Sequence, residues 1–150
     1  MVKVSYEQDF YSWSLQQADF LAQGRFNQLD ISHLVEEIQD LGNRHYDQME
    51  FRVTQLVAHL LKWRVQHWKQ TNSWRATIRV QCTAIAKLLK RNPGLKSRLE
   101  EALSESWSEA RDLAIAETDL PDSQFPESCP FLLSEILNPE FWPAPEERNL

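Results

Sequence analysis

Lysine and arginine side chains alternate with tryptophan rings near the middle of the chain, and this combination is suited to binding an anionic ligand. In proteins that bind nucleic acid, lysine and arginine neutralise phosphates while aromatic rings stack on unpaired bases. One interpretation is therefore a sequence-tolerant surface for nucleic acid. The residues that would form it are Lys62, Arg64, Lys69, Arg75 and Arg79, with Trp68 as a stacking ring near a predicted helix end.

The same segment also fits a structural interpretation. Trp63 continues the helical spacing of Leu56 and Leu60, which predicts a ring in the core. Trp74 precedes Ile78 by four residues and is predicted to be buried for the same reason. The cations would then pair with acidic helices of the same molecule or of a second copy, or lie in solvent. A basic surface for an acidic protein partner is a third interpretation.

A second group with chemical potential is acidic. His33 lies three residues before Glu36 and four before Glu37, so an imidazole and a carboxylate could share a metal on one helix face, with Asp40 a turn further on. The chain contains no Glu-x-x-His pair, however, which a di-iron bundle requires. Carboxylates near a helix start also complement its dipole. We therefore assign no metal and no cofactor, and a metal-dependent hydrolase is the least favoured class.

Ion pairing is a better use of Glu36 and Glu37. They are predicted to pair with Lys62, Arg79 or His59, because hydrogen-bonded ion pairs between bundle helices can fix register. His59 adjoins two leucines and is predicted to be an interior histidine rather than a general base. No local signature of a catalytic nucleophile occurs. A protein that is not an enzyme is favoured.

The net charge of −6 conceals a division along the sequence. Residues 1–50 carry −6, residues 51–99 carry +11 and residues 100–150 carry −11. The middle segment holds eleven basic side chains and no aspartate or glutamate. Such asymmetry predicts an anionic partner, which is either external or the acidic remainder of the chain.

Helical spacing of apolar residues predicts the elements that carry these groups. A first helix covers about residues 6–22 and stops at Gly24. A second begins after the cap Asp30 and covers about residues 31–69. It is predicted to be one long helix, with a break at Gly42 as the alternative.

Two further helices and a tail complete the prediction. The third helix covers about residues 74–91, and the fourth begins at Pro93 and ends near residue 120. Residues 121–143 form a proline-rich tail with one short helix over about 131–137. The tail carries several aromatic and aliphatic side chains, so it is expected to pack back on the helices.

Composition agrees with this arrangement. The chain has 150 residues, 42% of them apolar, and only three glycines, which argues against sandwiches, barrels and glycine-rich phosphate loops. We predict an all-α fold in a single domain, residues 1–150: an up-and-down bundle of about four principal helices with the tail packed over it. No apolar run approaches the ~18 residues of a membrane span, and no signal-peptide core opens the chain. Two cysteines are too few for a disulfide scaffold, so a cytoplasmic protein is expected.

Short motifs occur in a set order from Tyr6 to Pro143. They are Tyr6-Glu7-Gln8-Asp9-Phe10-Tyr11-Ser12-Trp13, Leu29-Asp30, Val35-Glu36-Glu37-Ile38, Leu41-Gly42, His59-Leu60-Leu61-Lys62-Trp63, Ser73-Trp74-Arg75, Arg79, Glu117-Thr118, Leu120-Pro121, Phe125-Pro126 and Cys129-Pro130. In this order they resemble the bacterial domain-of-unknown-function family twenty-nine, which is largely cyanobacterial. The resemblance implies a compact helical domain and supplies no activity or catalytic residues.

These observations favour a small interaction or adaptor protein with a basic central segment and acidic flanks. Its expected partner is another protein or a second copy of the chain. Nucleic acid is the alternative partner, bound by the basic and aromatic segment 62–79. No association with a membrane is expected.

Overall fold

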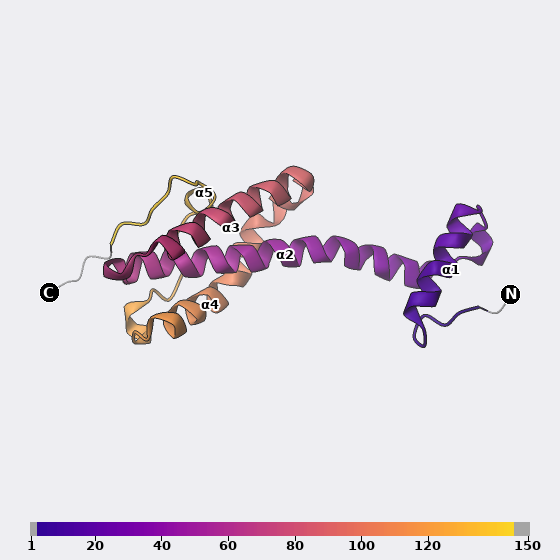
Figure 1. The fold of residues 1–150 in the computed structure, drawn as a ribbon, viewed down its shortest axis with the longest axis horizontal. Helices are drawn as coiled ribbons and strands as arrows, with labels where there is room; N and C mark the ends of the chain where they lie inside the picture. Colours follow the sequence, from indigo (N-terminus) through magenta and orange to yellow (C-terminus); the bar gives the residue numbers. More distant parts are fainter. Residues whose placement is uncertain (1–2, 146–150) are drawn as a thin grey trace. The chain divides into compact units, whose positions relative to one another are not determined.

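The computed structural model describes residues 3–145, and none of these residues forms a strand (Figure 1). The predicted all-α class, with four principal helices and one short helix in the tail, is confirmed. No helix in the described range has the length and apolar character needed to cross a membrane. The α-helices are α1 (Phe10–Ala22), α2 (Ile31–Val65), α3 (Asn72–Arg91), α4 (Leu99–Thr118) and α5 (Leu133–Ile136), with 3-10 helices at Phe26–Gln28, His67–Lys69, Pro93–Arg98 and Asp122–Gln124.

The chain divides into two compact units, one up to Arg44 and one from His45. Unit 1 contains α1 and the first part of α2. Unit 2 contains the rest of α2 together with α3, α4, α5 and the tail. Folding of the whole chain as a single domain stays a prediction.

Helix α1 begins later than the sequence pattern predicts, and the cap explains the difference. The Asp9 carboxylate accepts a hydrogen bond from the Ser12 backbone N–H at 3.0 Å, so α1 starts at Phe10. Ser5 Oγ accepts from the Gln8 backbone N–H at 3.4 Å and belongs to a turn before the helix. The helix ends at Ala22 as predicted. Gly24 follows with a φ of 70°, a left-handed conformation that suits glycine after a helix end.

Helix α2 is continuous through Gly42, so the prediction of one long helix is confirmed. A Cβ placed at Gly42 would meet no atom within 4 Å, which means that no close packing requires a glycine there. The helix ends at Val65, before the predicted residue 69, and a 3-10 turn follows. Gln70 Nε2 donates to the Trp63 carbonyl oxygen at 3.3 Å and so satisfies one carbonyl of the last turn.

The core of unit 2 lies where the second part of α2 packs with α3 and α4 (Figure 1). Apolar side chains of α2 recur at spacings of three and four residues and are buried. Facing them, α4 contributes small side chains, which let the helices approach closely. The central members of this core are Met49, Val53, Leu56 and Leu60 of α2, Ile78 and Ile85 of α3, and Ala102, Ala110 and Ala114 of α4.

The fourth α-helix starts at Leu99 rather than at the predicted Pro93. Pro93 begins a 3-10 helix that runs to Arg98, whose φ of −106° interrupts the helical run. Helix α4 ends at Thr118, and Asp119 then adopts a left-handed φ of 55°. The predicted helix is therefore correct in its main part and too long at its start.

The tail packs on unit 2, as predicted. Its side chains Phe125, Phe131 and Ile136 are 4%, 6% and 1% exposed. Arg111 of α4 holds the backbone, because its Nε donates to the Pro126 carbonyl at 2.9 Å and its Nη2 to the Asp122 carbonyl at 3.0 Å. Apolar burial and these hydrogen bonds together order a segment rich in proline.

Candidate interaction surfaces

Lys62, predicted as a phosphate contact, lies in the core of unit 2 instead. It is 5% exposed, and its Nζ lies 2.6 Å from Glu117 Oε2 on α4. The ammonium also lies 4.7 Å from the centre of the Trp74 ring, whose face attracts a cation. The prediction that Glu36 or Glu37 pairs with Lys62 is wrong, because the carboxylate partner is Glu117. A buried cation held in this way is not available to an external anion.

Trp63 and Trp142 form a ring pair beneath arginines of α3. Their centroids are 4.7 Å apart, and Trp63 is 6% exposed, so this ring is in the core as predicted. The Arg75 guanidinium lies 5.6 Å from the Trp63 ring and 5.7 Å from that of Trp142. Arg79 lies 5.8 Å from the Trp142 ring. Trp142 of the tail thus packs directly on the Trp63 ring.

The remaining predicted contact residues are distributed over different parts of unit 2. Arg64 is half-buried and lines a shallow pocket with the tail residues Phe131 and Trp142. Lys69 and Trp68 are exposed in the 3-10 turn that follows α2. Segment 62–79 is therefore divided among the core, the tail pocket, a turn and α3, although Arg64, Arg75 and Arg79 all lie beside Trp142.

Helix α3 carries a basic face, here defined as Arg75, Arg79, Lys87, Lys90 and Arg91, all exposed. Lys87, Lys90 and Arg91 lie on the side of α3 away from the stripe that faces the core, whereas Arg75 and Arg79 extend over tryptophan rings. Helix α3 contains no acidic residue. Arg75 and Arg79 were predicted from the sequence as contact residues, whereas Lys87, Lys90 and Arg91 were not. Continuing the four-residue spacing of the two arginines by two steps would have reached Lys87. The last two also lie in the final turn, where cations complement the helix dipole.

Few basic side chains of segment 51–99 are neutralised by ion pairs. Lys62 pairs with Glu117, and Arg98 Nε lies 3.0 Å from Glu101 Oε2, so the acidic segment 100–119 supplies both carboxylates. The other nine have no carboxylate oxygen within 4.0 Å in the part of the chain that the structure describes. The basic face of α3 belongs to this group.

His59 occupies a half-buried position on α2. Its Nδ1 lies 2.8 Å from the Gln55 carbonyl oxygen, which can only accept, so Nδ1 carries the proton. Burial lowers the pKa of the imidazole and favours its neutral form. This placement is that of an interior histidine.

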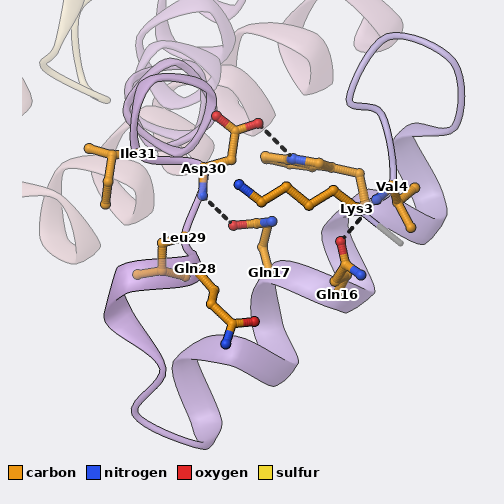
Figure 2. Close-up of a pocket in the computed structure, with 9 residues that line it drawn as sticks. Lys3, Val4, Gln16, Gln17, Gln28, Leu29, Asp30 and Ile31 are labelled. Carbon is orange, nitrogen blue, oxygen red and sulfur yellow. Dashed lines mark hydrogen bonds between the residues drawn. The ribbon is translucent and has the colours of Figure 1, made fainter. Parts of the chain in front are cut away.

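Unit 1 contains a hydrogen-bond network centred on Asp30, the residue before α2. Its Oδ2 accepts from Trp13 Nε1 at 3.0 Å and lies 2.7 Å from His33 Nδ1. The Asp30 backbone N–H donates to Gln17 Oε1 at 2.7 Å. Figure 2 shows the hydrogen bond between Asp30 and Gln17 beside a pocket into which the Lys3 side chain extends. The hydrogen bond to Asp30 raises the pKa of His33 and lowers that of Asp30.

The predicted metal ligands of unit 1 have other partners. His33 stacks on the Tyr6 ring, with centroids 4.0 Å apart and planes 15° apart. The Tyr6 hydroxyl donates to Glu37 Oε1, which raises the pKa of Tyr6 to about 12. Glu36 is exposed. Within residues 3–145, no group of three or more histidine, cysteine, aspartate or glutamate side chains is arranged to hold a metal ion.

Comparisons with known proteins give a family and no activity. No curated protein and no solved structure matches the chain. A family model, described as domain of unknown function DUF29, matches residues 5–142. The matched range includes both the Asp30 network and the basic face of α3. Since it covers nearly the whole chain, the protein belongs to the DUF29 family.

Proposed function

We propose that this protein is a non-enzymatic docking protein whose basic face on α3 binds an acidic surface of another protein. The observation that carries the proposal is that five exposed cations of one helix have no carboxylate within 4.0 Å in the described chain. From Arg75 to Arg91 the face extends about 24 Å at 1.5 Å per residue. Electrostatic complementarity over such a length gives fast and selective association.

Three of the tryptophan rings near the basic cluster favour a protein partner over nucleic acid, while Trp68, the predicted stacking ring, is exposed in the turn outside α3. Binding of single strands combines cations with rings on which bases stack. Trp63 is buried, Trp74 lies against Lys62, and Trp142 is covered by arginines. The basic face itself carries an exposed aliphatic side chain, Val80, which is 60% exposed and suits an apolar contact within a protein interface.

The proposal places this docking in the cytoplasm. Cys82 is buried and Cys129 is half-buried, and both are free thiols. Burial raises the pKa of both thiols, which disfavours the reactive thiolate. Reduced, unreactive cysteines are typical of a cytoplasmic protein.

The test compares two anionic probes and two matched variants of the full chain. The probes are a labelled polyglutamate peptide and a labelled single-stranded oligonucleotide with the same number of charges. The face variant is Lys87→Gln with Lys90→Gln, and the control is Lys3→Gln with Arg25→Gln, which removes the same charge from unit 1. Fluorescence anisotropy at low and near-physiological salt measures each dissociation constant.

We expect the peptide to bind, with an affinity that falls as salt rises and is weakened about 10-fold in the face variant and little in the control. Equal losses in both variants would mean that net charge, and not the face, attracts the peptide. Tighter binding of the oligonucleotide, again lost in the face variant, would replace the protein partner by nucleic acid.

A further inference from the structure

Unit 1 has an apolar groove between α1 and the first turns of α2. Phe10, Ala18 and Leu21 of α1 and Leu34, Ile38 and Leu41 of α2 line it, over a volume of about 360 Å³. Several of these side chains remain open to solvent. Ile38 is 66% exposed, Leu41 56%, Leu21 49% and Phe10 48%.

Unit 1 carries a disproportionate share of exposed apolar side chains. Among residues 3–145, nine of the thirteen large exposed hydrophobic residues lie between residues 10 and 41. On α2 the stripe that includes Ile38 and Leu41 continues at helical spacing to Met49 and Val53, which are fully buried in unit 2. A contiguous exposed apolar stripe of this kind marks an interaction site.

The charges beside the groove are self-complementary. Glu37 and Arg44 both line it, seven residues apart on one face of α2, which corresponds to about 10 Å along the helix. Arg44 has no hydrogen bond or ion pair with the described residues. Tyr6 occupies Oε1 of Glu37, which leaves Oε2 for a cation.

This pair of charges points to a second copy of the chain as the occupant. In a two-fold interface, residue i of one copy meets residue j of the other, and j meets i in turn. Antiparallel pairing of two α2 segments therefore brings each Glu37 near the Arg44 of the other copy. The same pairing places Leu41 of both copies near the axis and buries Ile38.

We propose that unit 1 is a dimerisation surface. Two copies pair their α1 and α2 segments about a two-fold axis and form a four-helix bundle, closed by two reciprocal Glu37–Arg44 ion pairs. Bundles of this kind bury the apolar stripes of amphipathic helices that a two-helix unit leaves exposed. The inference does not depend on the docking function of the basic face, which lies in unit 2.

A charge-exchange experiment tests the pairing directly in the full chain. Glu37→Arg and Arg44→Glu are prepared as separate proteins, and sedimentation equilibrium measures the mass of each alone and of their mixture. Each variant places like charges opposite each other in a homodimer, whereas the mixture restores both ion pairs. We expect a wild-type dimer, dimerisation weakened about 100-fold in each variant, and a heterodimer in the mixture.

An apolar pair of variants provides the matched control. Ile38→Glu places a carboxylate in the groove and is expected to abolish the dimer. Phe51→Glu alters another exposed apolar residue of α2, 60% exposed but outside the groove, and is expected to leave the dimer intact. Far-UV circular dichroism verifies that each variant remains helical.

Three results would overturn the proposal. They are a wild-type chain that stays monomeric at high micromolar concentration, a mixture of the charge variants that does not dimerise, and a dimer lost in Phe51→Glu but kept in Ile38→Glu. The last would place the dimer contact on a different surface.

Discussion

The two parts of α2 carry the same kind of apolar stripe, but they differ in how that stripe is covered. After His45, Met49, Val53 and Leu56 are fully buried by neighbouring helices of the same chain. Before Arg44, Ile38 and Leu41 remain more than half exposed. An amphipathic pattern in a sequence therefore predicts that a face will be buried, without saying whether the covering element comes from the same chain.

The largest expected effect comes from truncating the covered part of the stripe. Leu60→Ala removes a side chain that is 1% exposed and should lower the free energy of unfolding by about 3 kcal/mol, because it leaves a cavity. Leu41→Ala, 56% exposed, should cost less than about 1 kcal/mol when measured at a dilution that favours monomers. Urea denaturation followed by circular dichroism measures both. Equal losses would mean that the two parts of α2 are equally covered within one chain.

Part of this fold was predictable, and the exceptions have local causes. The continuity of α2 through Gly42 was predictable, because its apolar stripe passes Gly42 almost in phase and few helix breakers lie beside that residue, whereas its end at Val65 was not. The start of α1 was misassigned because both Ser5 and Asp9 can cap a helix, and only Asp9 does so. Proline at the start of a helix does not distinguish an α-helix from the 3-10 helix that begins at Pro93.

The site was less predictable than the fold. The partner of Lys62 could not be derived, because Glu117 lies 55 residues away and only the packing of α4 on α2 brings it near. The covering of Trp63 by Trp142 likewise depends on how the tail folds back. By contrast, Lys87 could have been predicted as part of the basic face, because it follows Arg79 by two four-residue steps of a helix.

The next largest effect on stability is expected from disrupting the ion pair between the buried Lys62 and the partly exposed Glu117. Glu117→Gln leaves the Lys62 ammonium in the core without an opposite charge and should lower the free energy of unfolding by about 2 kcal/mol. Lys62→Met keeps the aliphatic stem and removes the charge, so its effect should stay within about 1 kcal/mol. The exposed Glu109→Gln is the control. A neutral Glu117→Gln variant in chemical denaturation would show that the pair does not contribute to stability.

A smaller effect in the opposite direction is expected at Gly42. Gly42→Ala should stabilise the protein by about 1 kcal/mol, because alanine favours the helix and its Cβ meets no atom within 4 Å. Thermal unfolding of the variant measures the change. Destabilisation would contradict a continuous α2 and indicate a backbone conformation at this position that only glycine adopts.

The smallest expected effect is a dependence of the stability of unit 1 on pH, through His33 and Asp30. The pKa of His33 is raised above its usual 6.5 by Asp30, so the stabilisation from the protonated ring is fully present below pH 6.5 and is lost as pH rises through the folded pKa. The pKa of Asp30 is lowered below 3.8, so its stabilisation is present above that pH and is lost on acidification through the folded pKa.

Nuclear magnetic resonance of the His33 ring protons tests this pairing. Wild-type His33 should titrate above pH 6.5, and Asp30→Asn should shift the midpoint down towards that value. The His45 ring protons in the same spectra show whether the substitution also disturbs a histidine outside the pair. A His33 midpoint unchanged by Asp30→Asn would rule out the pairing as the cause of the shift.

Hydrogen exchange along α2, measured at several protein concentrations, tests the contrast between its two parts most directly. Amides of residues 49–63 should be protected to nearly the free energy of global unfolding at every concentration, because their own chain covers them. Amides of residues 31–44 should exchange faster in dilute protein and become protected as the concentration rises and a second copy covers the groove. Strong protection of both stretches at all concentrations would contradict the account, since a single chain would then suffice to cover the whole stripe.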